Sequence, residues 1–422
     1  MKPFPSISLA VSARVLCSVA CFIGTVAQAQ QDYERPPKLT PQQALGDIAV
    51  KTTLYEIGGE VLNDGISNHF YIFSGSDAYS VECNELAIER IREIGVIDHL
   101  GQIRRGEAFA DGVKKAAQGT LESAKTLITQ PLRTVGNAPQ GVRRFFSNAY
   151  QTTKRDPKSQ YEDAAYKEAI GFSAVKRNLA SELMVDVYSS NEQLQRELDE
   201  VAWTSYAGGV SLAALRTAAL PTSIGRPVSA GKTAVRVSQI VQEETPQNLE
   251  RRNREQLQTI GATASQIEAL VQNPWYSPRR QTALTEALYA LRSVRGIAGY
   301  LDRAVTAASE SEAYFMHRSA ELLEELHTTQ KPLTELYMGS GLPVAETKEG
   351  GLAAAFAIDH LIWSERVDRA TAGLRDELPA KHKETPVVVW VGGTASERAK
   401  THLAKRGLTV QEHALEQLIR AK

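Results

Sequence analysis

Three residues near the C-terminus, Gly392, Gly393 and Thr394, have types and spacing that could bind a small anion. They follow a short apolar stretch, 387–391, and precede a helical pattern. Backbone N–H groups at such a strand-to-helix junction can hold a phosphate or a carboxylate. The stretch matches neither GxGxxG nor GxxxxGK[ST], so we favour a tight turn in which Thr394 caps the helix, with Glu397 at capping-box spacing.

A second polar group, Asp186, Tyr188 and Asn191, lies between two helical patterns within residues 168–215. Polar side chains on a loop can bind a ligand or a partner. The same residue types also close turns and cap helices through bonds to their own backbone. We favour capping, and we predict a capping box formed by Ser190 and Gln193 at the start of the second helix.

Histidines and carboxylates offer two weaker candidates. His317 and Glu321 are four residues apart on a predicted helix and could share a metal ion, but no third ligand follows at a fixed spacing, so we favour a solvated helix face. Asp359 and His360 are adjacent, so their side chains should point apart on either a helix or a strand. We predict no metal site and no cofactor.

Composition predicts a folded chain of two or three domains. The 422 residues are 42% hydrophobic and 23% charged, with a formal net charge of −1. This balance indicates neither nucleic acid nor an acidic substrate as partner. The charge is uneven, however. Residues 32–100 contain 12 acidic and 5 basic residues, net −7, whereas residues 101–160 contain 11 basic and 4 acidic residues, net +7.

The N-terminus has the features of a signal peptide. Positive charge at Lys2 and Arg14 precedes an apolar region, 15–26, and small residues end at Ala29. The apolar region is shorter than the roughly 20 residues that span a bilayer. We predict cleavage near Ala29 and a periplasmic or secreted protein without a transmembrane helix, with lipidation of Cys21 as the alternative. Cys83 is then the remaining cysteine, which we predict to be a small buried group at a strand end.

The periodicity of apolar residues predicts an α+β fold that is mostly α-helical. A signal peptide, 1–29, is followed by a β-meander plus helix, 30–100, whose helix is capped by Asn84. A basic segment punctuated by Gly and Pro, 101–160, leads to a helical domain, 161–330. The last part, 331–422, is predicted to be a small α/β module containing a βαβ unit, although residues 352–363 fit a strand or a helix.

The basic segment is the predicted contact for a membrane or a protein partner. An amphipathic basic stretch with aromatic residues can lie on an anionic lipid surface. It can instead dock on the acidic N-terminal region or form a solvated helix face, and solvation is the commonest state of such charge runs. Nucleic acid is not expected, because the chain as a whole is not basic. The residues concerned are Lys114, Lys115, Lys125, Arg133, Arg143, Arg144, Phe145 and Phe146.

These patterns favour an exported, non-enzymatic binding or interaction protein of unknown partner. The alternative is a hydrolase whose active site is assembled from distant residues and therefore has no sequence motif. A cleft in which titratable groups converge, with Asp359, His360 or Glu365 among them, would favour the hydrolase. A flat surface with an exposed basic stripe would favour the interaction protein.

Overall fold

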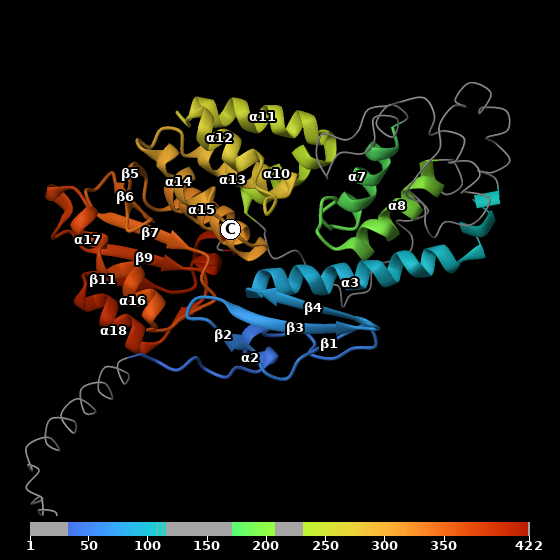
Figure 1. Cartoon of the computed structure of the whole chain (residues 1–422), viewed down its shortest axis with the longest axis horizontal. Helices are drawn as coiled ribbons and strands as arrows, with labels where there is room; N and C mark the ends of the chain where they lie inside the picture. Colours follow the sequence, from blue (N-terminus) through green and yellow to red (C-terminus); the bar gives the residue numbers. More distant parts are fainter. Residues whose placement is uncertain (1–32, 108, 112, 115–170, 207–230, 421–422) are drawn as a thin grey trace, which may run out of the picture.

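The computed structural model describes residues 33–107, 109–111, 113–114, 171–206 and 231–420 (Figure 1). The described chain is mostly helical with several small sheets, so the predicted α+β class is confirmed. Helices form the middle of the molecule. A small antiparallel sheet lies against the long helix α3. A mixed sheet near the C-terminus packs against α15 of the helical body and lies beside the antiparallel sheet.

The N-terminal unit consists of a sheet and the helix that covers it. Strand β3 pairs antiparallel with β4 on one side and with both β1 and β2 on the other, so the predicted antiparallel meander is present, with its first strand divided into β1 and β2. Phe70 and Ile72 of β3 are buried, whereas Tyr71 and Phe73 are exposed. The elements are α2 (Pro41–Leu45), β1 (Glu56–Ile57), β2 (Leu62–Asn63), β3 (Asn68–Ser74), β4 (Asp77–Glu82) and α3 (Asn84–Arg105).

The N-cap of helix α3 is one residue earlier than the predicted cap, Asn84. Cys83 occupies the N-cap position, and its Sγ atom accepts a hydrogen bond from the backbone N–H of Leu86. Asn84 is the first residue of the helix, and its side chain instead accepts a bond from Asn68. Cys83 is buried, which confirms the prediction of a small buried group at a strand end.

The helical body begins at α7, and several of its helices start at a Ser or Thr followed by Pro. Thr245 and Ser277 each accept a backbone N–H bond from the first turn, and the following proline has no N–H that needs a partner. The elements are α7 (Phe172–Glu182), α8 (Glu192–Tyr206), α10 (Lys232–Glu243), α11 (Pro246–Thr259), α12 (Ala264–Val271), α13 (Pro278–Ala290), η1 (Ile297–Gly299), α14 (Tyr300–Ala304) and α15 (Glu310–Thr329).

The C-terminal sheet is mixed, with strand order β11-β9-β7-β6-β5. Strands β7, β9 and β11 are parallel, and the predicted βαβ unit is present as β9–α18–β11. Residues 352–356 form a strand and not a helix. The elements are β5 (Leu333–Gly339), β6 (Leu342–Thr347), β7 (Leu352–Phe356), β8 (His360–Leu361), α16 (Glu365–Ala372), α17 (Leu374–Glu377), η2 (Ala380–His382), β9 (Val387–Val391), β10 (Thr394–Ala395), α18 (Glu397–Lys405), β11 (Leu408–Gln411) and η3 (Leu415–Arg420).

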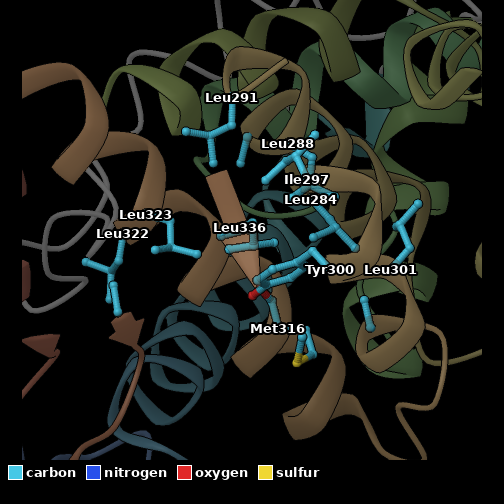
Figure 2. Close-up of a cluster of buried hydrophobic side chains, with 14 of the residues drawn as sticks. Leu284, Leu288, Leu291, Ile297, Tyr300, Leu301, Met316, Leu322, Leu323 and Leu336 are labelled. Atoms are coloured by element: carbon cyan, nitrogen blue, oxygen red, sulfur yellow. The ribbon is translucent and has the colours of Figure 1, made fainter. Parts of the chain in front are cut away.

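One hydrophobic core joins the helical body to the C-terminal sheet. Figure 2 shows Leu284, Leu323 and Leu336 among its buried side chains, which come from α13, α15 and β5. Ala353 of β7 and Trp390 of β9 belong to the same cluster, so α15 packs directly on the sheet. Within the described ranges, no helix is both long and apolar enough to cross a membrane.

Candidate functional site

A cavity of about 350 Å³ lies where α3, α7, α10, α13 and α15 meet. The turn between α7 and α8 also contributes to its lining. The helices can be located by their labels in Figure 1. The lining combines apolar side chains with eight charged ones, namely Glu85, Glu89, Arg92, Arg177, Asp186, Arg279, Arg280 and Glu321.

A buried ion-pair network forms one wall of the cavity. Arg318 of α15 is 1% exposed and donates to both carboxylate oxygens of Glu85 on α3, at 3.0 and 3.1 Å. It also donates to Glu321 at 2.6 Å, and the Tyr314 hydroxyl donates to Glu85 at 2.7 Å. Burial raises the pKa of Glu321, an effect that the charge of Arg318 partly offsets. The network ties α15 to α3 and orients the carboxylates of the wall.

A second network lies at the start of α13. Arg280 donates to Glu310 at 2.6 Å, and its Nη2 atom is 3.7 Å from Glu89. Burial raises the pKa of Glu89, while the charge of Arg280 acts in the opposite direction. The charge of Arg280 is therefore matched by carboxylates from two other helices.

Arg279, the neighbour of Arg280, bonds to a neutral hydroxyl group and not to a carboxylate of the described residues. Its Nη2 atom donates to the Ser238 hydroxyl at 3.0 Å, and no carboxylate of the described residues forms an ion pair with it. Ser238 in turn donates to the Ala234 carbonyl at 2.8 Å. The guanidinium group of Arg279 therefore brings to the cavity a positive charge that the described residues leave without an ion-pair partner.

His317 provides a neutral polar group in the same lining. The residue is 7% exposed, and burial, followed by the nearby charges of Arg280 and Arg318, holds the pKa of its imidazole well below the ordinary value. Within the described chain its Nδ1 atom makes no well-formed hydrogen bond, apart from a weak contact with the backbone of Ala313 one turn earlier. The ring is therefore uncharged at neutral pH.

Two apolar side chains of the lining reach the surface. Met184 is 45% exposed and Val235 is 54% exposed, which places both among the exposed large hydrophobic residues of the described chain. They follow α7 and lie in the first turn of α10, respectively. The opening of the cavity is therefore partly apolar, whereas charged side chains line the parts contributed by α3, α13 and α15.

The hydroxyl groups of the described lining are all engaged in structural bonds. Ser181 donates to Gln242 at 3.1 Å, Ser238 bonds to Ala234 and Arg279, and Tyr314 donates to Glu85. Neither serine contacts a histidine or a carboxylate. A serine nucleophile requires an adjacent base, and the described lining does not provide this pair.

The structure separates the three residues of the predicted polar group between α7 and α8. Asp186 lines the cavity, and its carboxylate accepts the backbone N–H of Tyr188 at 2.9 Å. Tyr188 and Asn191 are buried outside the lining. Asn191 caps α8 by accepting the N–H groups of Gln193 and Leu194. The predicted cap at Ser190 is wrong, because that hydroxyl points to Glu310.

The backbone N–H groups of Gly392, Gly393 and Thr394 are not available to bind an anion, because each already donates to a backbone carbonyl. Their backbone N–H groups donate to the carbonyls of residues 356, 358 and 359 at 2.9, 2.7 and 3.1 Å. A Cβ atom at Gly393 would lie 2.0 Å from the Asp359 carbonyl, so glycine permits this close approach of two backbones. Helix α18 starts later, with Ser396 as its cap, and the predicted cap at Thr394 is wrong.

His317 and Glu321 do not form the predicted solvated face. Both residues are buried, at 7% and 5% exposure, because α15 is covered by α13 on one side and by the C-terminal sheet on another. Both line the cavity, and Glu321 is held by Arg318. The residues that the structure describes contain no group of three His, Cys, Asp or Glu side chains arranged to hold a metal ion.

The side chains of Asp359 and His360, the candidate catalytic pair, bind different partners and do not contact each other through a hydrogen bond that the structure describes. Asp359 accepts the backbone N–H groups of Asn68 and Asn84, whereas the Nδ1 atom of His360 lies 2.7 Å from the Thr394 hydroxyl. Glu365 is exposed and pairs with Arg369. These three candidates therefore do not converge, and none of them lines the cavity.

The basic segment lies almost entirely outside the described residues. Lys114 is exposed and lies 3.4 Å from Asp111. The other predicted contacts are outside the described ranges: Lys115, Lys125, Arg133, Arg143, Arg144, Phe145 and Phe146.

Comparisons with known proteins give no relative for this chain. No protein-family model matches it, and neither the curated proteins nor the solved structures contain a match. The site therefore has to be judged on its own geometry.

Sequence reasoning missed Arg279 and Arg280, although one signal was present. Both arginines lie in the first turn of a helix that starts at Ser277-Pro278. Positive charge is unfavourable at a helix N-terminus, where the partial charge of the backbone is itself positive. Two arginines at this position therefore indicate that other groups, either protein carboxylates or a ligand, provide the compensating charge.

Proposed function

We propose that this chain is an exported, non-enzymatic binding protein that holds a small ligand in the cavity between α3, α7, α10, α13 and α15. Its support is the convergence of charged side chains from these helices on one cavity. Burial of an ion costs several kcal/mol, and filling the space with apolar side chains would avoid both this cost and that of the cavity. Ligand recognition is the function that accounts for the arrangement.

Export is proposed on the N-terminal sequence, whose charged, apolar and small-residue regions have the order of a signal peptide. Binding is preferred over hydrolysis because the described lining offers hydrogen-bond donors and acceptors, while its hydroxyl groups are held by structural partners. The cavity size lies at the lower end of the range for small-molecule sites.

A thermal-unfolding screen against small polar and charged metabolites tests this function. A ligand at 100 times its dissociation constant should stabilise the folded chain by about 2.7 kcal/mol. The variant Val235→Trp places a large ring at the opening and should abolish the stabilisation. Leu62→Trp on β2 is the matched control, because Leu62 is 49% exposed and lies outside the lining. Equal stabilisation of both variants by every hit would contradict the proposed site.

A further inference from the structure

We propose that the ligand of this cavity is a small organic anion with an apolar portion, whose acidic group binds Arg279 and whose apolar portion contacts Met184 and Val235. This inference deepens the proposed function, because it assigns a chemical class to the ligand of the same cavity. It depends on three observations: the charge of Arg279, the partners of the nearby carboxyl groups, and the combination of the buried imidazole of His317 with an apolar opening.

The first observation is that Arg279 lacks an ion-pair partner where neighbouring arginines have one. Arg280 pairs with Glu310, while Arg236 and Arg252 both pair with Glu286 at 2.7 Å. Within the described residues, Arg279 has only the neutral hydroxyl of Ser238. A guanidinium group presents a planar set of donors that matches a carboxylate or a phosphate. The N-terminal end of α13 adds partial positive charge at the same place.

The second observation concerns the acidic groups nearby, which would otherwise attract a cation. Asp186 accepts bonds from the Tyr188 backbone and the Ser277 hydroxyl. Glu89 lies 3.7 Å from Arg280, and Glu321 is held by Arg318 at 2.6 Å. Arg279 adds a longer-range favourable charge interaction with both carboxyl groups but forms an ion pair with neither. Each of these carboxyl groups is therefore held at short range by another protein group, whereas Arg279 has no carboxylate within ion-pair distance among the described residues.

The third observation is that the cavity lining combines a buried imidazole, that of His317, with an apolar entrance. His317 lines the cavity, and its ring is neutral and makes only a weak contact with the Ala313 backbone within the described chain, so the imidazole is available to bond to an acid group. Met184 and Val235 expose apolar surface at the opening. An apolar chain attached to the acid would cover this surface and remove it from water. An inorganic anion would satisfy Arg279 but would leave the apolar opening uncovered.

Isothermal titration of the purified chain with decanoate tests the inference. Decanol provides the same chain without charge, decyltrimethylammonium provides the opposite charge, and acetate provides the carboxylate without the chain. All amphiphiles are kept below their micelle-forming concentrations. We expect decanoate to bind at least tenfold more tightly than any of the three analogues.

Two variants locate the interaction. Arg279→Gln should weaken decanoate binding at least tenfold and leave any decanol binding unchanged, whereas Val235→Ser should weaken decanoate severalfold. Arg251→Gln is the matched control, because Arg251 is exposed on α11 and, among the described residues, forms its ion pair with Glu255 one turn away. A thermal-unfolding midpoint near that of the parent chain shows that each variant is folded.

The outcomes separate the inference from the proposed function. Absence of decanoate binding, equal binding of decanol or the cation, or unchanged affinity in the Arg279→Gln variant would overturn the anionic ligand. The proposed function would survive these results if another compound binds and Val235→Trp abolishes its binding. If no compound in the screen binds to the cavity, both proposals are wrong.

Discussion

Arg318 is among the largest fully buried side chains of the described chain, and it binds two buried carboxylates of the helical body. Its guanidinium group is 1% exposed and donates to Glu85 and Glu321, while Tyr314 donates to the same Glu85. A buried charge is tolerated only while its partners remain in place. The sequence shows Arg318 in a helical pattern but does not show that α13 and the sheet cover it.

Replacement of Arg318 by Met should therefore lower the free energy of unfolding by about 3–5 kcal/mol, because two buried carboxyl groups lose their partner. Urea denaturation measures the change. Arg251→Met, which removes an exposed ion pair, should change stability by less than about 0.5 kcal/mol. A triple variant, Arg318→Met with Glu85→Gln and Glu321→Gln, should be more stable than Arg318→Met alone. If the single variant loses less than about 1 kcal/mol, the network is not buried as described.

At the level of secondary-structure elements, most helices and strands could be predicted, whereas their exact starts could not. Apolar spacing of three or four residues predicted α7 and α8, and the turn residues between them were correctly interpreted as capping groups. The cap itself was predicted one residue too early. Asn191 occupies the position because its side chain both accepts bonds from α8 and donates to the buried Glu93 on α3 at 3.0 Å.

The variant Asn191→Ala should lower the free energy of unfolding by about 1–3 kcal/mol. The loss combines the cap of α8 with the hydrogen bond to the buried carboxyl group of Glu93. Ser190→Ala should change stability by less than about 0.5 kcal/mol, because that hydroxyl reaches only an exposed contact with Glu310. Guanidinium chloride denaturation compares the two variants. If Ser190→Ala loses more free energy of unfolding than Asn191→Ala, Ser190 is the cap of α8, as the sequence predicted.

At the level of the whole molecule, polar contacts fasten the N-terminal unit to the C-terminal sheet. The carboxylate of Asp359 accepts the backbone N–H groups that start β3 and α3, at Asn68 and Asn84. Around it, the Asn63 side chain donates to the His360 carbonyl and Arg366 pairs with Asp64 at 2.7 Å. The joined segments are about 290 residues apart in sequence, so no local pattern could predict this contact.

This junction makes the stability of the chain depend on pH. Burial raises the pKa of Asp359 to about 7, against the two backbone N–H bonds, which lower it. The folded state then holds a proton that the unfolded chain releases near pH 4. Stability from this group is therefore greatest at low pH and is lost as the pH rises from about 4 to 7. Because the residue is partly exposed, we expect a loss of roughly 1–2 kcal/mol.

Urea denaturation at several pH values between 4.5 and 7.5 measures the contribution of Asp359 to the free energy of unfolding, by comparing the parent chain with the variant Asp359→Asn. The parent should lose stability relative to the variant as the pH rises. The comparison is needed because Glu93 and Glu324 also have pKa values raised to about 7 and contribute to the same pH range. Glu365→Gln, an exposed substitution on α16, is the control. Parallel curves for the parent and Asp359→Asn would show that Asp359 does not titrate in this range.

The sequence by itself determined the fold class, the main helices and strands, and the β9–α18–β11 unit, because these follow from local spacing and from turn residues. Only the tertiary structure decided which charged residues are buried. His317 and Glu321 have the spacing of a solvated face, yet both are buried because α15 is covered by elements on more than one side. The candidate site combines side chains from five helices between residues 85 and 321. Packing of the helices brings these charged side chains together, and the spacing of residues along a single helix cannot predict this packing.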